Sequence, residues 1–204
     1  MVVLTLLSLL LTVSLFYLYE QNTKAKEAVE YITTTATTAN NSTTTFTAKG
    51  LISSLLPQFG SLQAQNNSNI MISYILGGYW NLDVVQGLVN DFKVNFTMVR
   101  PDGTGLHWIE FINFKQNKLV PVVLDLSEGT TFAGTMDIKE GNEIRWIGSP
   151  VSITISHLNV LSITPNSEYT NNFFQSQPIY GVVNNVTLSN NNDNKTTFLV
   201  SPIL

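Results

Sequence analysis

The first 19 residues form an unbroken run without a charged side chain, and Glu20 carries the first charge of the chain. Leucine dominates this run. As a helix rising 1.5 Å per residue, it would span roughly 28 Å, close to the hydrocarbon thickness of a bilayer. A cleavable secretory signal is disfavoured, because no Lys or Arg precedes Lys24 and no small-x-small site follows the run. We therefore predict a hydrophobic helix that is retained in the mature protein and that lipid or other helices must cover.

The helical pattern continues beyond this run. A 3-4-3-4 spacing passes through Leu11, Leu15, Leu18, Asn22, Ala25, Val29, Ile32, Ala36 and Ala39, which is the period of helices packed side by side. The first glycine is Gly50 and the first proline is Pro57, so no strong breaker interrupts the pattern. The sequence predicts one long helix over residues 1–39. A membrane anchor followed by a short stalk is the alternative.

Residues 40–68 differ from both flanking regions. The run Asn40 to Thr45 is polar and low in complexity, which is typical of a linker. Within this region, residues 50–59 place Leu51, Ile52, Leu55 and Leu56 on one face of a possible short helix that Pro57 would end.

From residue 69 onward, apolar and polar positions alternate in short runs separated by turn signals such as Pro101-Asp102-Gly103. The alternation is complete over residues 151–156 and nearly so over 92–99. The predicted strands are 70–76, 92–100, 106–114, 119–126, 130–138, 143–147, 151–156, 160–164, 179–188 and 196–200. This spacing favours an antiparallel, immunoglobulin-like β-sandwich over residues 69–204. The overall fold class is therefore α+β, a long helix followed by a β-sandwich.

Composition narrows the possible functions. Only 12% of residues are charged, the formal net charge is −4 and the pI is about 5.0. Because acidic residues outnumber basic ones, the chain has no excess positive charge to neutralise phosphates, which disfavours a nucleic-acid-binding protein. The chain has no cysteine, which excludes disulfides, thiol catalysis and Cys-type metal sites.

No catalytic motif stands out, and we expect neither an enzyme nor a cofactor or metal site. His107 and His157 lie in different predicted strands, and we expect each to be a structural or surface residue. The scattered carboxylates Asp102, Asp125 and Asp137 lack calcium-loop spacing, and we expect them to be exposed. We expect all three tryptophans, Trp80, Trp108 and Trp146, to fill the sandwich core. A sugar-binding platform is the alternative for them.

Several asparagines precede x-Ser/Thr and are candidate N-glycosylation sites. These are Asn41, Asn66, Asn95, Asn185 and Asn194, and Asn40 also matches the pattern. Because Asn, Ser and Thr are abundant, about four such matches would arise by chance. Asn41, Asn66 and Asn194 lie in polar, loop-like stretches, which makes them the more plausible acceptors if the protein faces outward.

This order of parts resembles processed subunits of archaeal type IV pili, the family that also includes the archaellins. That family loses a short, positively charged leader directly before the apolar segment, which would make Met1 the processed start rather than an initiator methionine. Bacterial pilins carry a glutamate near the start of the mature helix, where this chain has Thr5, and that difference fits the archaeal branch. The Leu-rich segment departs from the archaellin pattern and favours an adhesive or conjugation-type pilin.

The resemblance implies a structural subunit of an extracellular filament that serves adhesion, motility or cell–cell contact. The helix would form the filament core and the β domain its outer surface. The residues expected to pack the core are Leu7, Leu10, Leu11, Leu15, Leu18, Ala25, Val29 and Ile32. The implied partners are identical subunits, the membrane before assembly, and surface glycans or other cells. The alternatives are a membrane-anchored cell-surface glycoprotein with a β-sandwich ectodomain, or an archaellin.

Overall fold

The computed structural model describes residues 42–60, 70–117, 120–189 and 195–199. The chain divides into two compact units, Met1–Asn41 and Ser42–Leu204, and every described residue belongs to the second. The helix expected over residues 1–39, together with its core-packing residues, lies outside the described residues. Among the residues that are described, no helix is long and apolar enough to cross a membrane.

The described residues form eleven β-strands, and all of their pairings are antiparallel. They are β1 Ser42–Thr43, β2 Phe46–Gly60, β3 Ile70–Val85, β4 Leu88–Val99, β5 His107–Gln116, β6 Leu124–Asp125, β7 Gly129–Glu140, β8 Glu143–Ser156, β9 Val160–Pro165, β10 Ile179–Ser189 and β11 Lys195–Leu199. The predicted antiparallel β architecture is thus confirmed for this part of the chain.

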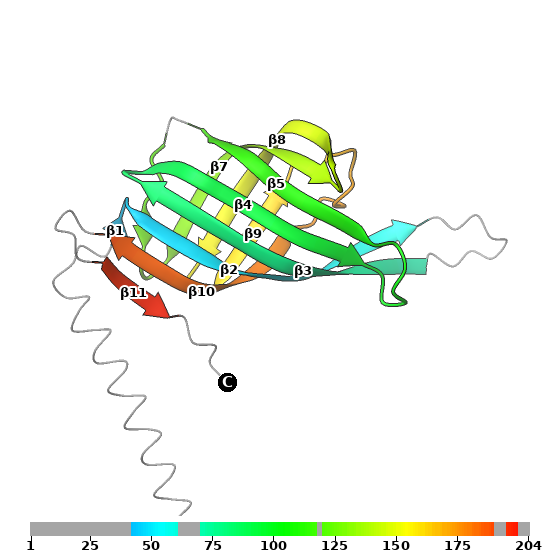
Figure 1. The fold of residues 1–204 in the computed structure, drawn as a ribbon, viewed down its shortest axis with the longest axis horizontal. Helices are drawn as coiled ribbons and strands as arrows, with labels where there is room; N and C mark the ends of the chain where they lie inside the picture. The colour runs from blue at the N-terminus through cyan, green and yellow to red at the C-terminus, as the bar shows by residue number, and fades with distance from the viewer. Residues whose placement is uncertain (1–41, 61–69, 118–119, 190–194, 200–204) are drawn as a thin grey trace, which may run out of the picture. The chain divides into compact units, whose positions relative to one another are not determined.

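The strands form a single sheet that closes on itself. Hydrogen-bonded neighbours follow the order β1-β6-β7-β5-β4-β3-β2-β10-β9-β8, and β11 pairs with β10. Because β7 also pairs with β8, the eight strands from β7 to β8 along this order make a ring. Figure 1 shows two facing walls, with β3, β4 and β5 in front and β7, β8 and β9 behind.

The closed ring differs from the two separate sheets of an immunoglobulin-like sandwich. The β5–β7 and β9–β10 pairings connect the two walls through backbone hydrogen bonds. Register shifts occur in these strands, between Ile112 and Lys115 in β5 and between Val183 and Asn185 in β10. Such bulges bend a strand and increase its twist, which allows one sheet to turn from one wall into the other.

The short helix expected over residues 50–59 is wrong, because these residues lie in β2. Ile52 and Leu56 point into the core, while Leu51 and Leu55 are exposed on the other face. Pro57 fits this strand because the pairing of β2 with β10 ends at Ile52, so among the described residues this part of β2 pairs with β3 alone. A proline, which has no N–H to donate, is tolerated on such an edge.

Other predicted boundaries also change. Since β1 and β2 belong to the sheet, the described β domain begins at Ser42 and includes part of the expected linker. The strand expected over 119–126 is reduced to Leu124–Asp125. The strands expected over 143–147 and 151–156 are one strand, β8, which continues through Pro150.

The core lies between the two walls and is rich in aromatic rings. Trp80 and Trp146 are buried as predicted, whereas Trp108 is 58% exposed, so the prediction that all three fill the core is wrong for Trp108. The alternation of β5 explains this, because its inward positions are held by Ile109 and Phe111. Edge-to-face ring contacts, such as Phe92 of β4 with Phe132 of β7 at 6.1 Å between centroids, join side chains of the two walls.

Candidate functional site

A groove of about 740 Å³ runs across the outer face of β5, β7, β8 and β9. Its floor follows one row of the sheet, in which Gln116 lies opposite Gly134, Gly134 opposite Val151, and Val151 opposite Pro165. A side chain on Gly134 would place its Cβ only 2.3 Å from the Lys115 carbonyl oxygen. The backbone of β5 therefore approaches Gly134 so closely that only glycine fits at this position of the row.

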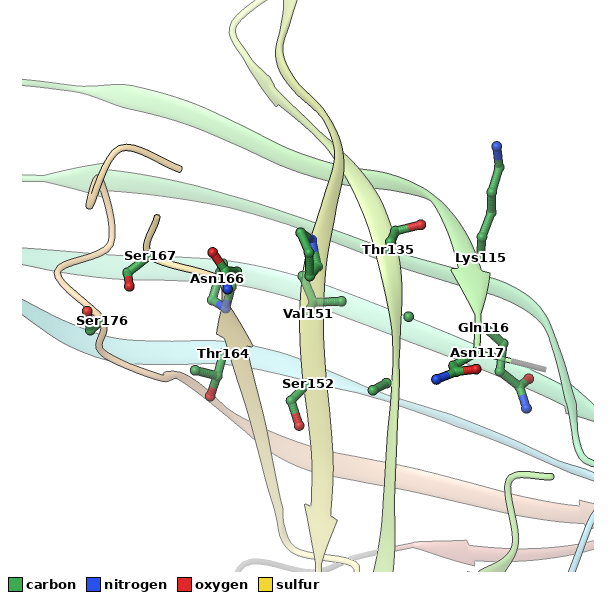
Figure 2. A pocket seen from close by; sticks show the side chains of 14 residues that line it. Lys115, Gln116, Asn117, Thr135, Val151, Ser152, Thr164, Asn166, Ser167 and Ser176 are labelled. Carbon is green, nitrogen blue, oxygen red and sulfur yellow. The ribbon is translucent and has the colours of Figure 1, made fainter. Parts of the chain in front are cut away.

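Hydroxyl and amide groups surround this floor. Figure 2 shows Thr135, Ser152 and Thr164 on the strands and Asn166 and Ser167 on the segment that follows β9. Lys115 is the one charged residue among the described residues that line the groove. The groove can thus donate and accept hydrogen bonds with a neutral polar ligand, but its lining has no carboxylate, histidine or thiol for acid–base or nucleophilic chemistry.

Gln116 has a structural role at one end of the groove. Its Oε1 accepts a hydrogen bond from the Val89 N–H at 2.7 Å. Its Nε2 donates to the carbonyls of Gly87 and Val120, both at 3.0 Å. With its amide engaged in this way, Gln116 joins the β3–β4 turn to the segment after β5 and is not available to a ligand.

A second polar cluster lies where β5, β7 and β8 meet. The His107 Nδ1 lies 2.6 Å from the Glu140 carboxylate, and Arg145 binds the other oxygen of Glu140. The Arg145 guanidinium also stacks over Trp146 and Phe173, 4.7 and 4.9 Å from their ring centroids. Every charged group of this cluster has a partner, which indicates a structural clamp.

The protonation of His107 follows from its surroundings. Burial lowers the pKa of the ring, and the positive charges of Arg145 and Arg100 lower it further. The Glu140 carboxylate favours the protonated ring, but Arg145 shares that carboxylate and offsets its effect. The neutral ring therefore carries its proton on Nδ1 and donates it to Glu140, since a carboxylate can only accept.

The remaining predicted candidates also have local structural explanations. His157 lies in the β8–β9 turn with a φ of 49°. Asp102 accepts from the Thr104 N–H, Asp125 from Ser127, and Asp137 from Asn113 and the Gly148 N–H. These hydrogen bonds lower the pKa of each of the three carboxyl groups. Within the described ranges, no group of three or more His, Asp or Glu residues could hold a metal ion.

Two of the five candidate glycosylation sites lie among the described residues. Asn95 is half-buried on β4, where its amide donates to Glu110 at 3.4 Å and its register partner is Tyr79. Asn185 is half-buried at the bulge of β10 and accepts from the Thr187 hydroxyl. Asn41, Asn66 and Asn194 lie outside the described residues.

Comparison with known proteins finds no match for this chain among family models, curated proteins or solved structures. Its function is therefore inferred from its own residues and their arrangement.

Proposed function

We propose that this chain is the structural subunit of an extracellular archaeal type IV pilus filament. One observation carries the proposal: a run of 19 residues without a charge precedes a β domain that fills its core with its own side chains. Because that core is already complete, the apolar run needs cover from lipid or from other molecules.

A helical filament provides that cover. Each copy's apolar helix is surrounded by the helices of its neighbours, and head-to-tail contacts continue without a closing symmetry. In this architecture, residues 1–39 form one long helix in the filament core. The β domain lies on the outside, and the membrane holds the helix before assembly.

The outer face of the β domain suits attachment to other surfaces. Its groove presents neutral hydroxyl and amide groups with a single lysine, a chemistry that matches neutral sugars better than charged ligands. Surface glycans of other cells are therefore the partners that we propose for this groove.

The proposal is tested by substitution in the apolar run of the full-length chain. We expect Leu10→Arg to abolish filaments in cells that produce it, because a guanidinium at a helix–helix contact would be buried without a partner. Leu10→Met conserves volume and apolar character, so it should assemble normally. Filaments are sheared from the cells and examined by negative-stain microscopy, and the membrane fraction is probed to verify that the Arg variant still inserts.

The outcomes separate the candidate functions. Fibres from the unsubstituted chain and the Met variant, but not from the Arg variant, would support the pilus. Normal fibres from the Arg variant would refute the packing role of the apolar run. An unsubstituted chain that stays in the membrane fraction without fibres would instead indicate an anchored surface glycoprotein, and fibres that rotate on living cells would indicate an archaellin.

A further inference from the structure

Four large apolar side chains face outward in one row across four neighbouring strands. Tyr79 of β3 lies opposite Leu51 of β2. Val182 of β10 lies opposite both Leu51 and Val160 of β9. Their exposed fractions are 57% for Tyr79, 50% for Leu51, 43% for Val182 and 41% for Val160. Cross-strand partners on one face lie about 5 Å apart, so the four side chains form a continuous row.

Three more exposed residues extend this row along the strands. Tyr180 lies two positions from Val182 on β10. Leu55 and Ile75 form a register pair four positions from Leu51 on β2 and from Tyr79 on β3. We define the apolar stripe as Leu51, Leu55, Ile75, Tyr79, Val160, Tyr180 and Val182. The register pair Ser53 and Gly77 lies within the stripe, and no atom lies within 4 Å of where a Gly77 Cβ would be. The stripe is therefore open to a partner.

The stripe is not an extension of the core. On β2, Ile52 and Leu56 point inward and are buried, and on β3, Leu76 and Trp80 do the same. Where the stripe crosses them, these strands thus carry large apolar residues on both faces. An antiparallel strand with one face in water normally alternates apolar and polar residues, so apolar residues on both faces indicate that the outer face is also covered when the protein functions.

The area of the stripe corresponds to half of a specific protein interface. Seven large side chains, each about half exposed and with on the order of 200 Å² of total surface, present roughly 700 Å². This exceeds the largest apolar patch of most monomers, about 300–600 Å². A stable interface buries about 600–1,000 Å² on each partner, so the stripe is large enough to form one side of such an interface.

The charges beside the stripe are balanced. Beside the stripe, the outward positions of β2, β3 and β4 carry Lys49, Lys93, Asp83 and Asp91, with the neutral Asn81 between the two lysines. Lys93 pairs with Asp91 at 3.1 Å. Two lysines and two aspartates give this band no net charge. A second copy of the chain can therefore approach this band without like-charge repulsion, whereas an anionic membrane would find no basic excess.

We infer that the apolar stripe packs against the β domain of a second copy of this chain in the filament wall. The inference rests on the proposed function, because the filament supplies neighbouring copies at high local concentration. It adds a second contact between subunits, on β9, β10, β2 and β3, to the contact made by the apolar run.

The absence of cysteine allows a direct test, because an introduced thiol is the only one in the chain. Leu51→Cys and Val182→Cys each place a thiol in the stripe, and Ile147→Cys, at a position 71% exposed on β8, is the control. Maleimide labelling rates are compared for full-length chains in filaments and after dissociation in mild detergent. We expect about tenfold slower labelling in filaments at positions 51 and 182, since interface centres exclude water, and little change at position 147.

If each of the three variants is labelled as fast in filaments as in dissociated chains, the inference is overturned, but the proposed filament is not. Equal protection at position 147 would overturn the assignment to this face. Slow labelling at 51 and 182 in dissociated chains, independent of protein concentration, would indicate that the chain's own apolar run covers the stripe. Protection that requires added phosphatidylcholine vesicles would indicate lipid. Absence of any filament would refute the proposed function instead.

Discussion

Two adjacent glycines in β3 are expected to respond in opposite ways to the same substitution. Gly78 faces inward, and an alanine Cβ there would lie 2.1 Å from the Asn95 carbonyl oxygen and 2.5 Å from the Phe96 Cα. Both atoms belong to the backbone of β4, which is hydrogen-bonded to β3, so neither can move without disturbing the sheet. Gly77 faces outward, and an added Cβ would meet no atom within 4 Å.

The difference between the two variants should be large. Overpacking against backbone typically costs about 1–3 kcal/mol, and the short contacts at Gly78 place Gly78→Ala at the upper end, about 3 kcal/mol. Gly77→Ala should stabilise by about 0.5 kcal/mol, because alanine restricts the unfolded chain more than glycine does. For a chain of this length, 1 kcal/mol shifts Tm by about 2–4 °C. Gly78→Ala should therefore lower Tm by roughly 6–12 °C, and Gly77→Ala should raise it by about 1–2 °C.

The assay is thermal unfolding of the full-length chain in mild detergent, followed by near-UV circular dichroism of the buried tryptophans. The unsubstituted chain provides the reference, and each glycine variant is the matched control for the other. Equal Tm values for the two variants would refute the assignment of Gly78 to the inward face and of Gly77 to open surface.

Two further predictions concern titrating groups. Arg145→Met removes a positive charge that lowers the pKa of His107, so an NMR titration should show the His107 pKa rising relative to that of the unsubstituted chain. A fall or no change would contradict the clamp. Hydrogen bonds from Asn113 and the Gly148 N–H lower the pKa of Asp137 from 3.8, so its contribution to stability is present above pH 3.8 and is lost as pH falls through the lower, folded-state value. Asp137→Asn should therefore flatten the dependence of Tm on pH below about 4, and an unaltered acid slope would exclude this role for Asp137.

The sequence predicts those parts of the fold that depend on local pattern. Strict alternation over residues 151–156 correctly predicts part of β8, because each side chain alternates between core and solvent. The helix predicted over residues 50–59 is wrong because Leu51, Ile52, Leu55 and Leu56 fit one helical face as well as the two faces of a strand. Only pairing with β3 and β10, which no local pattern encodes, decides between the two.

The groove and the apolar stripe were not predictable for a related reason. Lys115, Gly134, Val151 and Pro165 come from four strands and meet because of their register and the bulge in β5. Register is a long-range property, set when the ring closes. The sequence pattern placed Leu51 and Leu55 on the same helical face as Ile52 and Leu56, and it assigned Tyr79 to no element, so it could not show that these residues share an outer face of the sheet.

Closure of the ring also limits how copies of this domain can associate. Each of its eight strands pairs with a neighbour on both sides, so another chain cannot extend the ring by adding a strand. The part of β2 beyond Ile52 pairs with β3 alone, but it carries Pro57, and a proline hinders strand addition at an edge. Association through the ring itself therefore falls to side chains on its outer faces, where the apolar stripe gathers exposed apolar residues of β2, β3, β9 and β10. Outside the ring, β11 pairs with β10 alone among the described strands. A filament built from this chain would thus combine helices in its core with face-to-face contacts between closed β domains, so that weakening the stripe should loosen the wall before it separates the core.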